Sequence, residues 1–188
     1  MFDVELVTSK QDVDCGPACM KMLLGYYGTD VSLDDLIEEC GTWIGGCSGK
    51  DLLRVGRAHG LDMKAFRMEA AELIRQDRPA IVWWRYTHWI VFCGKDDNGN
   101  VVIANPSRGR YWIDVESFSK LYSGVSLWNG NPEEPQPRAT KPIAEGEFFC
   151  LDGQLCMAKT FIANGAILTL NTNYQITNIE EELTELNK

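Results

Sequence analysis

Residues 11–28 read QDVDCGPACMKMLLGYYG, and this segment carries the clearest local signals in the sequence. From residue 15 to residue 27, apolar side chains recur every three or four positions, which is the spacing of one face of an α-helix. Asp14 suits the N-cap, Pro17 falls in the first turn, and Gly28 follows the last helical residue. The segment therefore predicts a helix that begins at a cysteine.

Shorter helices and a sheet are predicted after this helix. Two serines, each followed three residues later by an aspartate, form capping-box patterns that open helices near 33–40 and 49–59. Runs of β-branched and aromatic residues predict strands, and the Asn98-Gly99 dipeptide between two of them is a hairpin signal. The strands are expected at 80–86, 88–93, 101–105, 110–113 and 125–128, with a short helix at 115–122. Helices first and an antiparallel sheet second is an α+β layout.

A proline-rich stretch divides the chain of 188 residues. Residues 129–142 hold four of the seven prolines and almost no apolar side chain, which predicts a semi-extended linker. We therefore expect one domain at residues 1–128 and a small β-hairpin and helix module at 143–188. The module is predicted to have a hairpin around Asp152-Gly153, strands at 166–170 and 174–177, and a seam of Ile176, Ile179, Leu183 and Leu186. That seam suits either a coiled coil or one packed helix face, so homo-oligomerisation is left open.

The overall composition excludes several classes of protein. The chain has 18 Lys and Arg against 27 Asp and Glu, and a net charge of −9 disfavours binding to nucleic acid. No apolar run reaches the ~18–20 residues that span a bilayer, and the N-terminus lacks the basic start of a signal peptide, so we expect no membrane insertion and a soluble protein made in the cytoplasm. Seven cysteines without a Cys-x-x-Cys pair favour reduced thiols. Two distant histidines make a poor zinc set, so no metal and no cofactor is expected.

Cys15 is the first candidate for a nucleophile. A thiol in the first turn of a helix lies at the positive end of the macrodipole, which favours the thiolate and lowers its pKa from about 8.5. Gly16 keeps one flank small, which would let a substrate backbone approach. The alternative is that Cys15 is a buried small hydrophobe, as most cysteines are. Cys19, one turn further along the helix, is expected to pack in the core.

A thiol nucleophile usually needs a base, and the chain has two histidines. His59 lies at a predicted helix end and is interpreted as a surface histidine, whereas His88 opens an apolar strand at the rim of the sheet. Asn105 ends the next strand of the hairpin, close to His88, and is the candidate to orient the imidazole ring. Gln11 and the backbone N–H of Cys15 are the candidate donors to an oxyanion. Each residue also has a simpler interpretation, as a structural histidine, a strand end before proline or an exposed glutamine.

The order of these motifs along the chain resembles that of the bacteriocin-processing, double-glycine leader peptidases, which are papain-like. The resemblance covers about residues 5–128. Beyond the cysteine motif, its matching positions are 60–61, 88–91, 105–106, 109–110 and 118–124. It implies a papain-like fold and a peptide or protein substrate. It also implies Cys15 as nucleophile, His88 as base, Asn105 as the orienting residue and Gln11 as oxyanion donor.

Two departures from this family affect what the resemblance implies. The family usually has aspartate where this chain has Asn105, so the negative charge beside the imidazole is missing. No transporter follows the peptidase-like segment in this sequence, so the exporter context and the leader substrate are not expected to carry over.

The C-terminal segment resembles the short modules at the ends of bacteriophage tail or fibre proteins. The matching positions are 148–155, 158–160, 162–163 and 172–173. The resemblance implies a phage or prophage origin and attachment of residues 143–188 to a virion or to a second copy of the chain. A generic β-rich appendage is the alternative.

The leading hypothesis is therefore a cysteine peptidase that hydrolyses peptide bonds with a Cys-His-Asn triad and a glutamine oxyanion donor. Two alternative hypotheses use the same fold. One is a catalytically retired peptidase fold that serves as a virion structural or adaptor protein. The other is a phage hydrolase of cell-wall peptides or amides.

Overall fold

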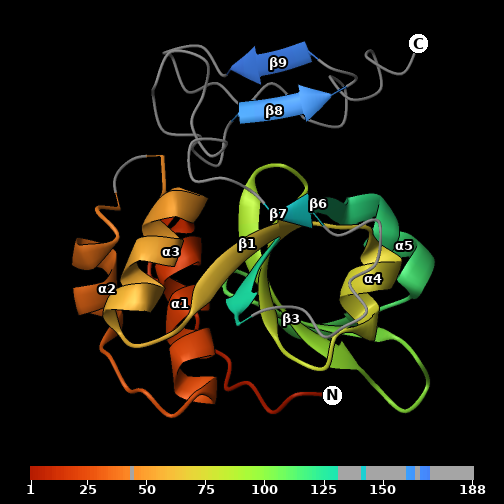
Figure 1. The fold of residues 1–188 in the computed structure, drawn as a ribbon, viewed down its shortest axis with the longest axis horizontal. Coiled ribbons are helices and arrows are strands. Elements are labelled where there is room, and N and C mark those ends of the chain that lie inside the picture. The colour runs from red at the N-terminus through yellow and green to blue at the C-terminus, as the bar shows by residue number, and fades with distance from the viewer. Residues whose placement is uncertain (43–44, 131–140, 143–159, 164–165, 170–188) are drawn as a thin grey trace.

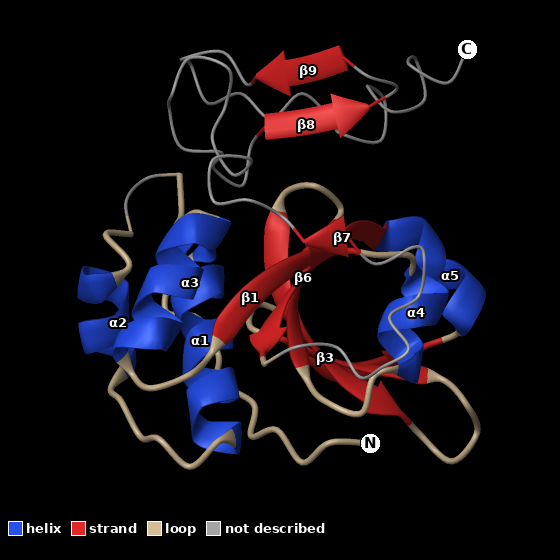
Figure 2. Ribbon diagram, in the orientation of Figure 1, coloured by secondary structure: helices blue, strands red, loops and turns tan. Residues whose placement is uncertain are grey.

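A computed structural model of the protein describes residues 1–42, 45–130, 141–142, 160–163 and 166–169. In Figure 1, helices α1, α2 and α3 lie on one side of a curved antiparallel sheet, and helices α4 and α5 lie on the other side. Figure 2 shows the same division by secondary structure. The predicted α+β class is confirmed. In this described part of the chain, no helix has the length and apolar content that would let it cross a membrane.

The helices begin where the sequence predicts their caps. They are the 3₁₀ turn η1 (Asp12–Asp14), α1 (Cys15–Tyr26), α2 (Leu33–Glu39), α3 (Gly49–Ala58), α4 (Ala70–Arg75) and α5 (Val115–Leu121). The hydroxyl of Ser48 accepts a hydrogen bond from the backbone N–H of Asp51, and the Asp51 carboxylate accepts one from the backbone N–H of Ser48. Ser32 accepts from the backbone N–H of Asp35 in the same way. The predicted helix starts are therefore confirmed, while α4 was not predicted.

The sheet has seven strands, and every neighbouring pair is antiparallel. The strands are β1 (Met63–Arg67), β2 (Ala80–Trp84), β3 (His88–Lys95), β4 (Val101–Asn105), β5 (Gly109–Ile113), β6 (Tyr122–Asn129) and β7 (Lys141–Pro142). Their order across the sheet is β5-β4-β3-β2-β6-β1-β7. The five predicted strands are present, and β1, which was not predicted, pairs along its whole length with β6.

Two tight turns fix the registers of β2, β3 and β4. In the β3–β4 turn, the Asp96 carboxylate accepts hydrogen bonds from the backbone N–H groups of Asn98 and Asn100, which confirms the predicted hairpin. In the β2–β3 turn, Arg85 and Tyr86 both have positive φ, at 51° and 58°. These φ angles are left-handed, a conformation that residues other than glycine rarely adopt. Two-residue hairpin turns commonly require it, and this turn leads into β3, which begins at His88.

Each face of the sheet is covered by its own apolar core. Side chains of α1, α2 and α3 pack on one face, and those of α4 and α5 pack on the other. Because both faces are covered, every residue of β4 is buried and β3 is exposed only at its two ends. His88 lies at one of these ends, which is where a strand residue can reach a binding site.

The far end of the chain is described only in part. A two-stranded sheet pairs β8 (Thr160–Ala163) with β9 (Ala166–Thr169), which confirms the position of the strand predicted at 166–170. The predicted hairpin around Asp152-Gly153, the strand at 174–177 and the seam from Ile176 to Leu186 lie outside the described residues.

Both ends of the predicted linker belong to the seven-stranded sheet. Asn129 is the last residue of β6, and Pro142 in β7 pairs with Phe66 of β1. A proline is tolerated there because β7 is an edge strand, where a backbone N–H is not needed for pairing on the outer side. Residues 131–140 lie outside the described part of the chain, so the division into domains stays a prediction.

Candidate active site

The thiol of Cys15 lies between the first turn of α1 and the beginning of β3. Helix α1 packs on β3, and the Cys15 side chain is only 3% exposed. The backbone N–H of Trp89, the residue after His88, hydrogen-bonds to the Cys15 sulfur. The fold therefore brings the predicted nucleophile next to the strand that carries the predicted base.

The environment of Cys15 raises the pKa of its thiol. Burial raises it to about 11, and this effect exceeds the opposing effect of the backbone N–H groups of Trp89, Gly16 and Cys15 itself. The predicted lowering of the pKa is wrong in sign, because burial of the thiol raises the pKa by more than the N–H groups at the helix start lower it. The thiol is consequently protonated at neutral pH, and it needs a base to become a nucleophile.

The imidazole of His88 is held by Asn105 across the β3–β4 hairpin. His88 Nε2 lies 3.0 Å from Asn105 Oδ1, and Asn105 is 2% exposed. The Asn105 side chain is itself fixed, since Oδ1 accepts a hydrogen bond from the backbone N–H of Ser107 and Nδ2 donates one to the hydroxyl of Tyr111. The predicted proximity of His88 and Asn105 is therefore confirmed.

This contact selects one tautomer of the imidazole. Because Asn105 Oδ1 is an acceptor, His88 Nε2 must carry the proton that it donates, and Nδ1 is left with a free lone pair. Burial lowers the pKa of His88 below its ordinary value of 6.5, although the hydrogen bond that His88 donates to Asn105 opposes this. The ring is therefore neutral at pH 7, with Nδ1 able to accept a proton.

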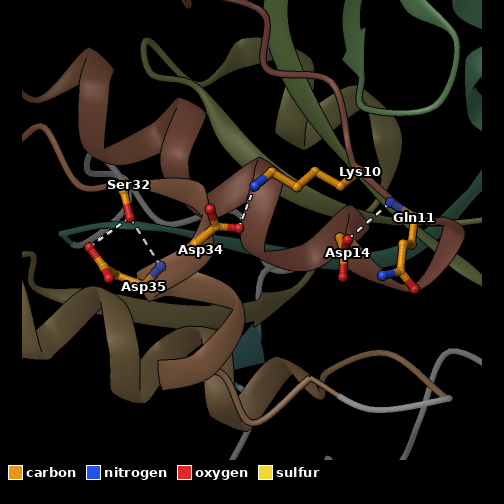
Figure 3. Close-up of polar contacts among 6 residues, drawn as sticks. All are labelled: Lys10, Gln11, Asp14, Ser32, Asp34 and Asp35. Carbon is orange, nitrogen blue, oxygen red and sulfur yellow. Dashed lines mark hydrogen bonds and ion pairs between the residues drawn. The ribbon is translucent and has the colours of Figure 1, made fainter.

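Gln11 lies in the short turn that leads into α1. Its backbone N–H donates to the Asp14 carboxylate at 3.0 Å (Figure 3). The backbone N–H of Asp14 in turn donates to the Gln11 carbonyl at 3.1 Å. Asp14 occupies the N-cap position of α1, as predicted, but its side chain makes no capping bond to that helix. Its carboxylate instead fixes the backbone of Gln11 within one turn of Cys15.

Gly16 has a different role from the one predicted. A Cβ atom added at Gly16 would lie 2.3 Å from the sulfur of Cys47 and 3.4 Å from Cδ1 of Trp89. The small flank beside Cys15 is thus filled by the protein's own side chains, so it is not open to a substrate on that side. Cys47 has no sequence signal of its own, whereas Trp89 is marked by its position directly after His88.

The remaining candidate residues lie where the sequence predicts them. His59 caps the C-terminal end of α3, and its Nε2 lies 2.7 Å from Glu39 Oε2. Cys19, which belongs to α1, is fully buried in the core between this helix and the sheet. The five cysteines of the described residues are free thiols, and no group of three metal-ligating side chains occurs within that same part of the chain.

Comparison with known proteins gives consistent matches over the part of the chain that contains these residues. A model of the peptidase C39 family matches residues 3–133. The lactococcin-G-processing and transport ATP-binding protein LagD of Lactococcus lactis is 29% identical over 148 residues, which are 75% of this chain and 20% of LagD. The colicin V secretion/processing ATP-binding protein CvaB of Escherichia coli is 25% identical over 140 residues, which are 73% of this chain and 20% of CvaB. The chain thus spans about a fifth of the length of these curated relatives.

Solved structures share the fold. A double glycine motif protease from an AMS/PCAT transporter, crystallised in complex with the leader peptide, is 26% identical with a TM-score of 0.65, over 76% of this chain and 94% of that chain. The peptidase domain of Streptococcus ComA is 21% identical with a TM-score of 0.62, over 66% of this chain and 96% of that chain. These likenesses confirm the predicted papain-like fold of this family.

The family match ends at residue 133, so it does not reach the C-terminal segment. The resemblance of residues 143–188 to phage tail modules, and with it virion association, stays a prediction. Residues 3–133 cover most of the chain, and their match to the family model shows that the chain belongs to the peptidase C39 family.

Proposed function

We propose that the protein is an active cysteine peptidase that cleaves peptides after a double-glycine motif. The observation that carries this proposal is the 3.0 Å contact between His88 Nε2 and Asn105 Oδ1, because it leaves His88 Nδ1 as the proton acceptor. His88 is the first residue of β3, and the backbone N–H of the next residue, Trp89, binds the Cys15 sulfur. Nucleophile, base and orienting residue are thus all present, which favours an active peptidase over a retired one.

In the first step, the sulfur of Cys15 attacks the carbonyl carbon of the scissile bond while His88 Nδ1 takes the thiol proton. Both groups are neutral in the free protein, since burial raises the pKa of Cys15 to about 11 and lowers the pKa of His88. Proton transfer therefore accompanies the attack and is not completed beforehand. His88 acts as a general base in this step.

The developing oxyanion needs hydrogen-bond donors that are already in place. We assign this role to the side-chain amide of Gln11 and the backbone N–H of Cys15, which lies at the start of α1. The bond from Gln11 N–H to the Asp14 carboxylate fixes the backbone of Gln11 next to that helix start. Asp14 then acts as a positioning residue for Gln11.

The second half of the reaction uses the same imidazole. The His88 imidazolium gives its proton to the leaving amine as the C–N bond breaks, and Cys15 is left as a thioester. Water then attacks the thioester carbonyl, with His88 again as base, and releases the acid product and the free thiol. Throughout these steps Asn105 keeps Nε2 occupied, so that Nδ1 is always the nitrogen that exchanges protons.

A double-glycine substrate fits the burial of the nucleophile. The Cys15 side chain is 3% exposed, so a peptide backbone must come very close to the surface for its carbonyl carbon to reach the sulfur. Residues without a Cβ atom allow that approach. The relatives support the same substrate, since the solved structure that is 26% identical is described as a double glycine motif protease in complex with the leader peptide.

The direct test is cleavage of a synthetic peptide that contains Gly-Gly, with a matched peptide in which both glycines are alanines. We expect cleavage after the second glycine, detected by mass spectrometry, and much slower cleavage of the alanine peptide. Purified peptidoglycan forms the third arm. Release of cell-wall fragments with no cleavage of the Gly-Gly peptide would contradict the proposal and favour the cell-wall hydrolase.

Asn105 provides a test of how the imidazole is oriented. Asn105→Ala removes the acceptor of Nε2, and we expect kcat to fall by about 10- to 100-fold, a part of what a general base contributes. Asn105→Asp keeps the acceptor and adds a negative charge, which raises the pKa of His88. The acid limb of the pH–rate profile is therefore expected to move to higher pH. Asn98→Ala, an exposed residue of the β3–β4 turn, is the control and should leave both quantities unchanged.

We also propose that the peptidase occupies residues 1–128 and that residues 129–142 join it to a separate module at 143–188. The family match ends at residue 133, and β8 and β9 form a sheet of their own, which supports a separate module. Asn129 and residues 141–142, by contrast, pair within the peptidase sheet. Attachment to a second copy of the chain or to a virion remains the function proposed for the module.

A further inference from the structure

Trp89 contacts the beginning of α1 with both its backbone and its side chain. Its backbone N–H hydrogen-bonds to the Cys15 sulfur, and Cδ1 of its ring lies 3.4 Å from the position that a Cβ would take at Gly16. The whole residue is buried, with 4% of its surface exposed. Trp89 is therefore in contact with two consecutive residues of the helix start.

The indole N–H ties a second segment to the same place. Trp89 Nε1 donates to the Cys47 carbonyl at 3.3 Å, and the Cys47 sulfur fills the space left by the missing side chain of Gly16. Cys47 lies just before α3, so this bond joins the start of α3 to β3. The contacts of Trp89, Cys47 and Gly16 thus form a closed ring beside Cys15.

The Trp89 ring is also supported from the neighbouring strand. Trp83 of β2 is its cross-strand partner, and the two ring centroids are 4.4 Å apart with an interplanar angle of 55°. The ring of Trp89 therefore contacts Trp83 and lies close to Gly16, and its indole N–H donates to the Cys47 carbonyl. Such packing leaves a side chain few alternative rotamers.

We propose that Trp89 is a positioning residue of this peptidase, whose indole N–H fixes the Cys47 backbone against Gly16 and thereby sets the place of the Cys15 sulfur relative to His88. This inference rests on the function proposed above and assigns Trp89 no contact with the substrate. Without the N–H, the buried Cys47 carbonyl loses its donor and the segment before α3 is free to shift. A displacement of the reacting atom by ~1 Å is enough to lower a rate by about 100-fold.

The experiment uses Trp89→Phe in the full chain, with Trp128→Phe as the matched control. Trp128 is also fully buried, but its indole N–H has no hydrogen-bond partner, so its loss removes no such bond. We expect Trp89→Phe to lower kcat by about 10- to 100-fold with KM changed less than about twofold. Trp128→Phe should leave both constants near the wild-type values. Equal kinetics in the wild type and Trp89→Phe would overturn the inference.

Alkylation of Cys15 by iodoacetamide separates this inference from the proposed function. The alkylation rate as a function of pH reports the thiol and the neighbouring imidazole without any peptide substrate. A wild type that hydrolyses no peptide overturns the proposed function. In that case, a pH profile of alkylation that is the same in Trp89→Phe and the wild type overturns the positioning role, and a changed profile supports it.

A second variant covers the case in which Trp89→Phe does not fold. Incorporation of β-(3-benzothienyl)alanine at position 89 keeps the shape of the indole and replaces its N–H by sulfur. The same loss of kcat is expected, with an unchanged far-UV circular dichroism spectrum and an unfolding temperature lower by only about a few degrees, because one buried hydrogen bond is lost. Wild-type kcat in this variant would overturn the role assigned to the N–H.

Discussion

Cys15→Ala is expected to lower kcat/KM for hydrolysis of a Gly-Gly peptide by about 10,000-fold or more, because it removes the nucleophile on which the covalent mechanism depends. The variant loses a single sulfur at the start of α1, so the fold should be retained. The measurement is a time course of peptide cleavage by mass spectrometry at enzyme concentrations above that of the substrate. The circular dichroism spectrum and unfolding temperature are recorded on the same sample.

Cys19→Ala is the matched control for this variant. Cys19 lies one turn along the same helix and is fully buried, so its replacement also removes one buried sulfur. We expect it to lower the free energy of unfolding by about 1 kcal/mol and to leave kcat within about tenfold of the wild type. Substantial hydrolysis by Cys15→Ala, or equal losses in the two variants, would refute Cys15 as nucleophile.

His88→Ala is expected to lower kcat/KM at pH 7 by about 1,000-fold and to change the shape of the pH–rate profile. In the wild type, activity should rise as the pH increases through the pKa of His88, which burial places below 6.5, because only the neutral ring accepts the thiol proton. Above that pKa the rate is expected to be constant over the neutral range, since the pKa of Cys15, at about 11, is not reached.

Without the imidazole, the thiolate has to form by direct ionisation of Cys15. The remaining activity of His88→Ala should therefore increase by about tenfold per pH unit toward pH 11, with no inflection at the pKa of an imidazole. His59→Ala is the control, since His59 pairs with Glu39 at the end of α3 and should leave the wild-type profile unchanged. If the rate of His88→Ala still rose through the same inflection as that of the wild type, another group would be the base.

The fold could be predicted where the signal is local. The helix from Cys15 begins at a residue with capping and periodicity signals, and the turn at Asn98-Gly99 identifies the hairpin. By contrast, β1 contains Lys64 and Arg67 among five residues, so it has no clear alternation of its own. It is a strand because β6 pairs with it, and this partner lies far along the sequence. Helix α4 has only six residues, which is too short for a periodic pattern.

The same distinction applies to the candidate site. The contact between His88 and Asn105 follows from a single hairpin, so the sequence predicts it. The pKa of Cys15 does not depend on the helix start alone. The backbone N–H of Trp89 reaches the Cys15 sulfur from β3, and the Cys47 sulfur, from the segment before α3, fills the space beside Gly16. Their combined effect is a property of the packed protein, which no local window of the sequence contains.

The distribution of the candidate site along the chain has a consequence for biosynthesis. The sulfur-bearing helix leaves the ribosome well before the β3–β4 hairpin, which brings the imidazole and its amide partner. A nascent chain that has emerged only as far as α3 thus has a thiol but no proton acceptor beside it. Under the proposed mechanism, proteolytic competence is therefore acquired only once the β3–β4 hairpin has packed against α1.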